Sequence, residues 1–209
     1  MNCDKSLSVD AKKKQMRKEV LSKRNSLKKD YKVKADLQIC EGLKVNLEFS
    51  SNSSIAVYSP VGSEVDITQF VEYIYKKHPN VNVCYPYVKD GKIKLIRITE
   101  GRQAPFIKDP LWIPDDAELE EYLHIGFHRI TSVLVPLIAF DKNCNRLGHG
   151  GGCYDDLIAK VPSALKIGIG YKEQLVPKVP IDSNDNPVDL VLSNGKNKWK
   201  WYGGGSCLK

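Results

Sequence analysis

The sequence has little of what marks a secreted, zinc-binding or membrane protein. Its six cysteines include no Cys-x-x-Cys pair and no matching histidine spacing, so disulfide frameworks and zinc sites are disfavoured and we expect free thiols. No stretch approaches the ~18 apolar residues of a membrane span, and the lysine-rich N-terminus lacks the apolar core of a secretory signal. These absences predict a cytoplasmic protein outside the membrane.

Two well-known nucleotide motifs are missing as well. No Lys-Ser or Lys-Thr follows the glycine loop, which excludes a Walker A site, and Cys153 stands where a dinucleotide fingerprint has its third glycine. The pair Gly168 and Gly170 lies in an apolar run and indicates a strand that another element approaches closely. There is no internal repeat. Residues 1–202 are expected to form one domain, and the glycine-rich residues 203–209 a flexible tail.

An apolar run followed by a glycine-rich loop carries most of the chemistry. The run Val133–Phe140 is followed by four closely spaced glycines: Gly148, Gly150, Gly151 and Gly152. Glycines let the backbone approach an anion, and the helix expected next offers free N–H groups to it. Arg146 can pair with phosphate oxygens, and Asp155 can hold a magnesium ion that bridges them. An ordinary flexible turn is the alternative for the glycines alone.

Basic residues are concentrated near the N-terminus, within a net charge of +7. They are expected on a helix with Asp10 as its N-cap and with an apolar stripe formed by Met16, Val20, Leu21 and Leu27. Lys13 and Arg17 are four positions apart, so they share a helix face and can reach one anion. An RNA-binding surface is the alternative explanation, and a solvated helix face is the ordinary one for most of these charges.

The remaining pattern alternates between helices and strands, which predicts a single-domain three-layer α/β/α sandwich with a mostly parallel sheet and an N-terminal basic helix. Loops after strand ends in such sheets form ligand crevices. Helices are expected at 32–48, 67–77 and after the glycine loop. Strands are expected at 55–58, 81–85, 93–99, 133–139, 167–171 and 190–192. Residues 101–116 are expected to have little regular structure, followed by an acidic, loosely helical stretch.

The segment from Pro136 to Asp155 resembles the signature of the 5-formyltetrahydrofolate cyclo-ligase family. That signature is an apolar strand ending in Pro-x-x-x-Phe-Asp, followed by Arg-Leu-Gly-x-Gly-x-Gly-x-Tyr-Asp. Further landmarks occur in the family's order: Lys13 to Arg17, Glu64, Tyr85-Pro86, and Asn184-Asp185 with Val188-Asp189. The chain departs from the family at Lys108-Asp109-Pro110, where Glu-Pro is expected, and at Cys153, which replaces an aromatic residue.

The resemblance implies an ATP- and Mg²⁺-dependent enzyme that cyclises 5-formyltetrahydrofolate to 5,10-methenyltetrahydrofolate and releases ADP and phosphate. Lys13, Arg17 and Arg146 would stabilise charge during catalysis. The implied ATP contacts are Lys13, Lys14, Gln15, Met16 and Arg17, then Arg146, Leu147, Gly148, His149, Gly150, Gly151, Gly152, Cys153 and Tyr154. The implied substrate contacts are Tyr58, Glu64, Tyr85 and Tyr154.

Asp155 and Asp185 are the implied metal ligands. The residues alone leave Asp185 and Asp189 open as alternatives, and the family's spacing favours Asp185. Without the resemblance, Glu64 could simply favour the dipole of a helix capped by Ser63 or Asp66, and the loop around Asp185 could be an ordinary turn. Buried tyrosines are common in cores, and His149 could be a solvated loop residue.

Two alternative functions remain at this point. The departures at Lys108-Asp109-Pro110 and Cys153 leave open a folate-binding relative without activity, and the basic helix leaves open an RNA-binding protein. We expect 5-formyltetrahydrofolate and ATP as partners, no nucleic acid, no membrane, and a monomer.

Overall fold

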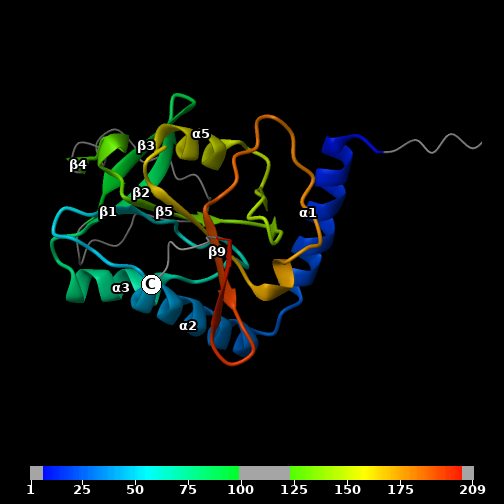
Figure 1. Cartoon of the computed structure of the whole chain (residues 1–209), viewed down its shortest axis with the longest axis horizontal. Coiled ribbons are helices and arrows are strands. Elements are labelled where there is room, and N and C mark those ends of the chain that lie inside the picture. Colours follow the sequence, from blue (N-terminus) through cyan, green and yellow to red (C-terminus); the bar gives the residue numbers. More distant parts are fainter. Residues whose placement is uncertain (1–6, 99–122, 204–209) are drawn as a thin grey trace, which may run out of the picture.

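An eight-stranded sheet runs through the centre of the molecule, for which a computed structural model describes residues 7–98 and 123–203 (Figure 1). The order of its strands is β10-β9-β8-β5-β1-β2-β3-β4. The strands are β1 Ser54–Ala56, β2 Asn82–Lys89, β3 Lys92–Arg97, β4 Leu123–His124, β5 Ser132–Pro136, β8 Leu165–Ile169, β9 Leu190–Asn194 and β10 Trp199–Gly203. The helices are α1 Val9–Asn25, α2 Lys29–Asn46, α3 Thr68–Lys77 and α5 Cys153–Lys160, with short 3₁₀ turns η1 Phe127–Arg129 and η2 Lys172–Gln174.

The five central strands are parallel. β1 pairs with β2 on one side and with β5 on the other, and β8 and β9 extend the sheet beyond β5. The chain therefore moves outward from β1 in one direction and returns to the opposite side of β1 at β5, which makes β1 and β5 a topological switch point. Antiparallel pairing joins β3 to β2 and β10 to β9. The expected mostly parallel sheet is confirmed.

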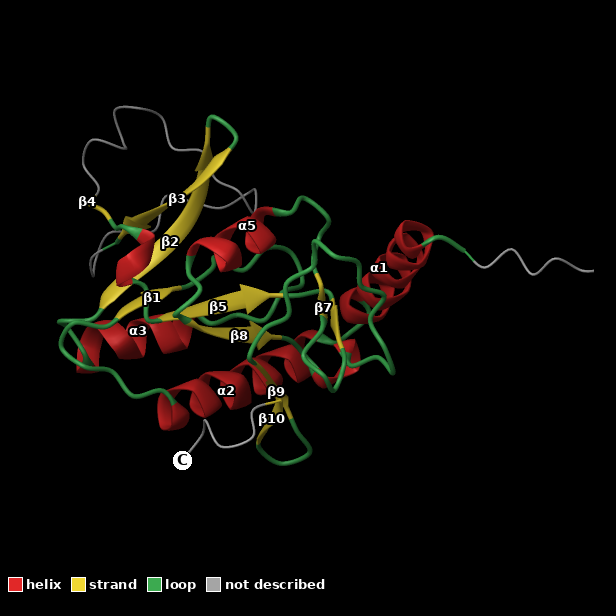
Figure 2. Cartoon of the chain, turned by 45° about the horizontal axis from the view of Figure 1, so that its top comes forward, coloured by secondary structure: helices red, strands yellow, loops and turns green. Residues whose placement is uncertain are grey.

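Helices cover both faces of the sheet (Figure 2). Ile55 and Leu134 belong to the core that α2 and α3 bury, whereas their neighbours Ala56 and Val133 belong to the core that includes Leu157 of α5. Successive strand residues point to opposite faces, so strands that are apolar at every position fit a sheet covered on both sides. This arrangement confirms the three-layer α/β/α sandwich.

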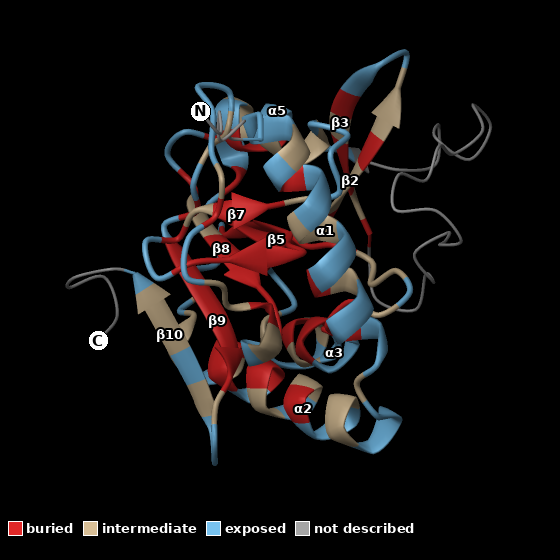
Figure 3. Ribbon diagram, turned by 90° about the vertical axis from the view of Figure 1, so that its right-hand side faces the viewer, coloured by how far each residue is buried: buried red, intermediate tan, exposed pale blue. Residues whose placement is uncertain are grey.

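Helix α1 lies at the end of the sheet, with its outer side exposed (Figure 3). Val20 is buried against Ile138, Ala139 and Leu147, and Met16 and Leu21 pack around it, which confirms that part of the expected apolar stripe. The expected N-cap is wrong. Ser8 caps the helix, since its hydroxyl accepts the backbone N–H of Ala11 at 3.2 Å, and Asp10 lies in the first turn.

Several element boundaries differ from the expected ones. Helix α2 begins at Lys29 rather than at residue 32. Strand β2 continues to Lys89 because Asp90 and Gly91 both adopt positive φ and turn the chain tightly into β3. The hairpin of β6 Ala139–Phe140 and β7 Arg146–Leu147 was not expected. Residues 101–116 and most of the acidic stretch after them lie outside the described residues, as does Thr99.

Strand β10 includes Gly203, which was expected in the tail. Gly203 is the last residue of this strand and pairs with Leu190 of β9. It has a φ of +79°, and a Cβ there would lie 2.8 Å from the carbonyl oxygen of Asp189. The backbone of Gly203 therefore approaches the sheet as only glycine allows. Residues 204–209 are not among those described.

The close approach expected at Gly168 and Gly170 is confirmed. A Cβ at Gly168 would lie 2.8 Å from Cδ2 of Leu137, and one at Gly170 would lie 2.7 Å from Cδ1 of the same residue. The side chain of Leu137 thus occupies the space above Gly168 in β8 and above Gly170, which follows the strand.

Two predictions about cysteines and membranes can be compared with the described part of the chain. Cys40, Cys84, Cys144 and Cys153 are free thiols there, as expected. Among helices in residues 7–98 and 123–203, none has the length and apolarity that crossing a bilayer requires.

Candidate active site

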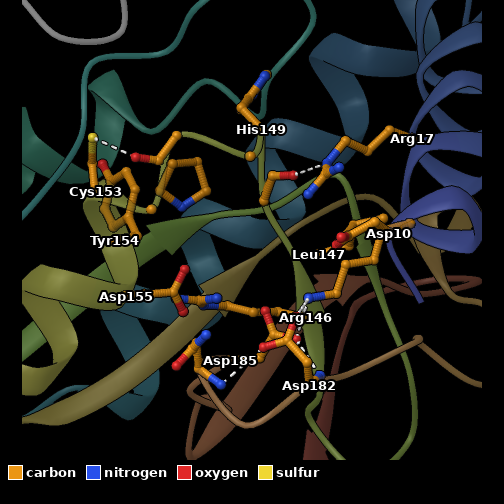
Figure 4. Close-up of a pocket in the computed structure, with 17 residues that line it drawn as sticks. Asp10, Arg17, Arg146, Leu147, His149, Cys153, Tyr154, Asp155, Asp182 and Asp185 are labelled. Carbon is orange, nitrogen blue, oxygen red and sulfur yellow. Dashed lines mark hydrogen bonds and ion pairs between the residues drawn. The ribbon is translucent and has the colours of Figure 1, made fainter. Parts of the chain in front are cut away.

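A pocket of about 400 Å³ lies at the carboxyl end of the central strands, next to the switch point (Figure 4). Helix α1, the end of β5, the glycine loop, the start of α5 and the loop of residues 182–185 form its walls. The lining residues are Asp10, Lys13, Arg17, Pro136, Arg146, Leu147, Gly148, His149, Gly150, Gly151, Gly152, Cys153, Tyr154, Asp155, Asp182, Asn184 and Asp185.

Asp141 fixes the β6–β7 hairpin that leads into the glycine loop. Its buried carboxylate accepts the backbone N–H groups of Asn143 and Asn145, and on its other oxygen that of Val179. These hydrogen bonds hold the turn between the two short strands. As a result, Arg146, the first residue of β7, lies in the wall of the pocket.

The glycine loop uses two residues in the left-handed region. Gly150 has a φ of +102° and Gly152 a φ of +71°, and Gly152 is the N-cap of α5. The loop therefore delivers the start of α5, with its unpaired N–H groups, to the pocket. Arg17 packs against this loop: its Nε donates to the carbonyl oxygen of Gly148 at 2.8 Å, and a Cβ at Gly150 would lie 3.3 Å from its Cζ.

Arg146 and Asp155 form an ion pair at the base of the pocket. Nη2 of Arg146 lies 2.9 Å from Oδ1 of Asp155, and the arginine side chain is 4% exposed. Oδ1 also accepts the backbone N–H of Asn186 at 3.2 Å, whereas no described residue donates to Oδ2. Nε of Arg146 is buried and has no partner among the described residues. Each side chain thus retains hydrogen-bonding capacity for a ligand.

Lys13 is buried and shared by two carboxylates. Its Nζ donates to Oδ2 of Asp182 at 2.6 Å and to Oδ2 of Asp185. Burial opposes the charged ammonium, but the hydrogen bonds and charges of the two aspartates outweigh it, so the pKa of Lys13 is raised. The hydrogen bond from Lys13 lowers the pKa of Asp182. Asp189, the alternative to Asp185, is not among the lining residues and accepts the backbone N–H of Lys166 instead.

The helical period separates the residues of the Lys13 to Arg17 segment. Lys13 and Arg17 face the pocket, whereas Lys14 and Gln15 are exposed and do not line it. Met16 packs behind the pocket with Val20. The structure therefore brings two of these five expected ATP contacts to the pocket.

Glu64 reaches the glycine loop from the segment that follows β1. Its Oε1 lies 3.0 Å from Nε2 of His149, and its Oε2 accepts the backbone N–H of Val61 at 3.0 Å. Arg24 lies buried nearby, and its Nε donates to the hydroxyl of Ser63 at 2.8 Å. Burial lowers the pKa of Arg24, and the charge of Glu64 opposes that change. Glu64 itself is not among the residues that line the pocket.

The three tyrosines expected at the substrate lie in different places. Tyr154 lines the pocket, and burial raises its pKa. Tyr58 is buried and its hydroxyl donates to the carbonyl oxygen of Val65 at 2.9 Å. Tyr85 packs against the core cluster that contains Tyr58. Neither of these two tyrosines lines the pocket. Burial raises the pKa of Tyr58 and Tyr85 as well, so all three hydroxyls stay protonated at neutral pH.

The carboxylates in the pocket could bind a divalent cation that has few protein ligands. Within the described residues, no group of three His, Cys, Asp or Glu side chains forms a metal cage. Mg²⁺ in nucleotide sites, however, is held by one or two carboxylates together with phosphate oxygens and water. Asp155 and Asp185 line the same pocket and are 31% and 20% exposed, and Oδ2 of Asp155 is free to coordinate. These two residues fit such a site.

Known proteins match most of this chain. Residues 9–194 match the model of the 5-formyltetrahydrofolate cyclo-ligase family. The chain belongs to this family.

Similar cyclo-ligases occur in mammals and bacteria. The 5-formyltetrahydrofolate cyclo-ligase of Mus musculus is 22% identical over 195 residues, which cover 89% of this chain and 95% of the mouse protein. The solution NMR structure of Aquifex aeolicus 5,10-methenyltetrahydrofolate synthetase has 28% identity and a TM-score of 0.76, and covers 94% of this chain and 96% of the other. The Mycoplasma pneumoniae synthetase has 27% identity and a TM-score of 0.68, and covers 87% and 98%. The Aquifex aeolicus and Mycoplasma pneumoniae synthetases therefore share the fold of this cyclo-ligase family member.

Sequence reasoning missed several residues of this cyclo-ligase pocket. Asp182 was read as part of an ordinary turn, and Asp10 as a helix cap, yet both line the pocket. Outside the pocket, Arg24, one of the basic residues of the N-terminal segment, is also buried and is 3% exposed. Its position one turn beyond Val20 on α1 was the only available signal, because that spacing places it on the buried face.

Proposed function

We propose that this protein converts 5-formyltetrahydrofolate to 5,10-methenyltetrahydrofolate and that ATP is split to ADP and phosphate in the reaction. One observation carries the proposal: Lys13, Arg17 and Arg146, from two distant parts of the sequence, line one pocket together with the glycine loop. Three cations around a loop of free backbone N–H groups suit a chain of phosphates. Family membership supports 5-formyltetrahydrofolate as the companion substrate.

The formyl group explains why ATP is needed. 5-Formyltetrahydrofolate carries a stable amide, whose oxygen is a poor leaving group. In the proposed reaction the formyl oxygen attacks the γ-phosphate of ATP and ADP departs. N10 of the folate then forms a bond to the activated formyl carbon and loses its proton to solvent, and the oxygen leaves with the phosphate. The work of the protein is to position the reactants and to stabilise charge.

The pocket residues divide this work. Arg146, held by Asp155, and Arg17, held by the glycine loop, would bind phosphate oxygens, and Lys13 would contribute a third positive charge. The backbone of Gly150 to Gly152 would donate hydrogen bonds to the same oxygens. Asp155 and Asp185 would hold Mg²⁺, which when bound would supply positive charge to neutralise the phosphates.

Glu64 and Tyr154 are proposed for the folate. The reduced pterin ring carries paired N–H donors, and a carboxylate fixed at the pocket edge by His149 and Val61 can accept them. Tyr154 offers a flat surface to the ring. Tyr58 and Tyr85 belong to the core against which Tyr154 packs, so we propose that they support the site from behind.

The setting of the reaction is part of the proposal. Free thiols at Cys40, Cys84, Cys144 and Cys153 suit a reducing compartment, in agreement with a cytoplasmic enzyme. We also propose that the protein acts as a monomer.

The direct test mixes the purified protein with 5-formyltetrahydrofolate, ATP and Mg²⁺ and follows the near-ultraviolet absorbance of the methenyl product. We expect a rise that requires both ATP and Mg²⁺. Asp155→Asn should abolish it, whereas Asp156→Asn, which changes a neighbouring exposed carboxylate paired with Lys160, should not. Folate binding without product would favour the noncatalytic relative. Salt-sensitive binding to RNA, with no response to folate or ATP, would favour the nucleic-acid alternative.

A further inference from the structure

Asp182 and Asp185 share the ammonium group of Lys13, although a single carboxylate would neutralise it. Lys13 is 6% exposed, and these are its only ion-pair partners among the described residues. A buried ammonium is stable only while it is paired. The second carboxylate therefore has a role besides neutralising Lys13.

The pocket carries more negative than positive side chains. Its described lining has three cations, Lys13, Arg17 and Arg146, and four carboxylates, Asp10, Asp155, Asp182 and Asp185. An excess of negative charge opposes the binding of a phosphate chain. Under the proposed function, Asp155 and Asp185 bind a divalent cation, and the net charge of the pocket then becomes positive. This exchange would leave Lys13 without Asp185.

The loop that carries Asp182 is built to keep this carboxylate in place. Oδ1 of Asp182 accepts the backbone N–H of Asn184 at 2.8 Å, and Oδ2 accepts Lys13. The backbone N–H of Asp185 also points to the carbonyl oxygen of Asp182, at 3.3 Å. The backbone N–H of Asp182 also donates to Oδ2 of Asp185 at 2.8 Å. The hydrogen bonds to Oδ1 and to that carbonyl, in contrast, do not involve the side chain of Asp185, so they persist when that side chain changes partner.

We propose that Asp182 is a positioning residue that holds the ammonium of Lys13 toward the pocket while Asp185 is engaged with a divalent cation. The inference rests on the proposed function and deepens it. Asp182 acts through Lys13 and touches neither nucleotide nor folate. Asp185 and Asp182 thus divide two tasks, binding the cation and retaining Lys13.

The proposal predicts that the effect of removing Asp182 depends on Mg²⁺. With Mg²⁺ present, Asp182→Asn leaves Lys13 without a carboxylate partner, so the affinity for ATP should fall. Asp182 is partly exposed, and we expect roughly a fivefold loss. Without Mg²⁺, Asp185 still pairs with Lys13 and the pocket loses a negative charge, so the affinity for ATP should stay the same or rise.

The experiment is a calorimetric titration of the full chain with ATP, with Mg²⁺ and with a chelator. The variants are Asp182→Asn, Asp182→Glu, Lys13→Met and the double variant Asp182→Asn/Lys13→Met. Asp156→Asn is the control, because Asp156 forms an ion pair with Lys160 outside the pocket. We expect Asp182→Glu to recover part of the affinity, and Asp182→Asn to have no further effect when Lys13 is already replaced. Thermal midpoints report whether each variant is folded.

Two results would overturn the inference. One is an equal loss of affinity with and without Mg²⁺, which would indicate only a disturbed loop. The other is the same loss in the Lys13→Met background, which would mean that Asp182 does not act through Lys13. Failure of the unsubstituted protein to bind ATP at all is a different result, since it would overturn the proposed function and this inference with it.

Discussion

Glu64 and His149, which are 85 positions apart in the sequence, meet at the edge of the pocket with Nε2 and Oε1 separated by 3.0 Å. The Glu64 side chain is 4% exposed and the His149 side chain 48%. Glu64 is therefore fixed in the protein interior, and His149 is about half exposed to solvent. A ligand that enters the pocket can replace His149 on Oε1 while Val61 continues to hold Oε2.

Glu64→Gln should weaken folate binding selectively. The amide keeps the shape of the side chain but loses the charge and one acceptor, which costs about 1.5–3 kcal/mol for hydrogen bonds of this kind. Titration with 5-formyltetrahydrofolate should show a loss of about tenfold or more. The affinity for ATP should stay unchanged. Glu72→Gln on the exposed side of α3 is the control, and equal weakening of both ligands would contradict a folate role.

Arg17→Met should reduce the affinity for ATP far more than Lys14→Met does. Both changes remove one positive charge from α1, but only Arg17 lines the pocket and contacts the glycine loop. A charge-assisted contact to phosphate is worth about 1.5 kcal/mol or more, so we expect at least a tenfold change for Arg17. For Lys14 we expect a change within about twofold. Equal effects would mean that only the overall charge of the helix matters.

Asp36→Asn should stabilise the protein above pH 6 and have little effect on stability near pH 4. Burial raises the pKa of Asp36 to about 6, although Tyr171 donates a hydrogen bond to Oδ1 at 2.6 Å. Because the folded state holds this proton more tightly than the unfolded chain, stability is lost as the pH rises from about 4 to about 6. The full difference corresponds to roughly 3 kcal/mol, and partial exposure reduces it to about 1–2 kcal/mol.

Urea denaturation at pH 4 and pH 7 measures this effect. The gain in unfolding free energy of Asp36→Asn over the unsubstituted protein should be greater at pH 7 by that amount. Glu41→Gln, on the exposed side of the same helix, should show no such pH-dependent gain. A gain of the same size at both pH values would rule out the buried charge as its cause.

Gly168→Ala should destabilise the fold, whereas Gly148→Ala should not. A Cβ at Gly168 would meet Leu137, Val191 and Val188 at 2.8–3.2 Å, and overpacking of this kind costs about 1–3 kcal/mol. A Cβ at Gly148 would meet nothing within 4 Å. The urea midpoints of the two variants provide the comparison. A shift for Gly148→Ala as large as that for Gly168→Ala would contradict the packing argument.

Local patterns in the sequence predicted much of the fold and part of the pocket. The four-residue spacing of Lys13 and Arg17 placed both on one helix face, and that face meets the glycine loop. The alternation of helices and strands predicted a sheet with helices on both sides, and Ile55 and Ala56 do belong to opposite cores. Such features depend on periods of 3.6 and 2 residues, which can be read without knowledge of distant contacts.

The residues that were missed depend on contacts between distant segments. Nothing near Asp182 in the sequence indicates that its partner is Lys13, which is 169 positions away. Strand β10 was missed because its pairing with β9, rather than its own pattern, makes it a strand. The motif that carries the family resemblance also spans Lys14, Gln15 and Met16, yet helix geometry turns these three away from the pocket.

The central claim is that ATP is consumed to cyclise the folate. The most direct test measures ADP and 5,10-methenyltetrahydrofolate in the same sample, with Mg²⁺ present and with each substrate omitted in turn. The account predicts equal amounts of the two products and neither product when ATP or 5-formyltetrahydrofolate is left out. Formation of ADP without folate, or of the methenyl product without ADP, would contradict it.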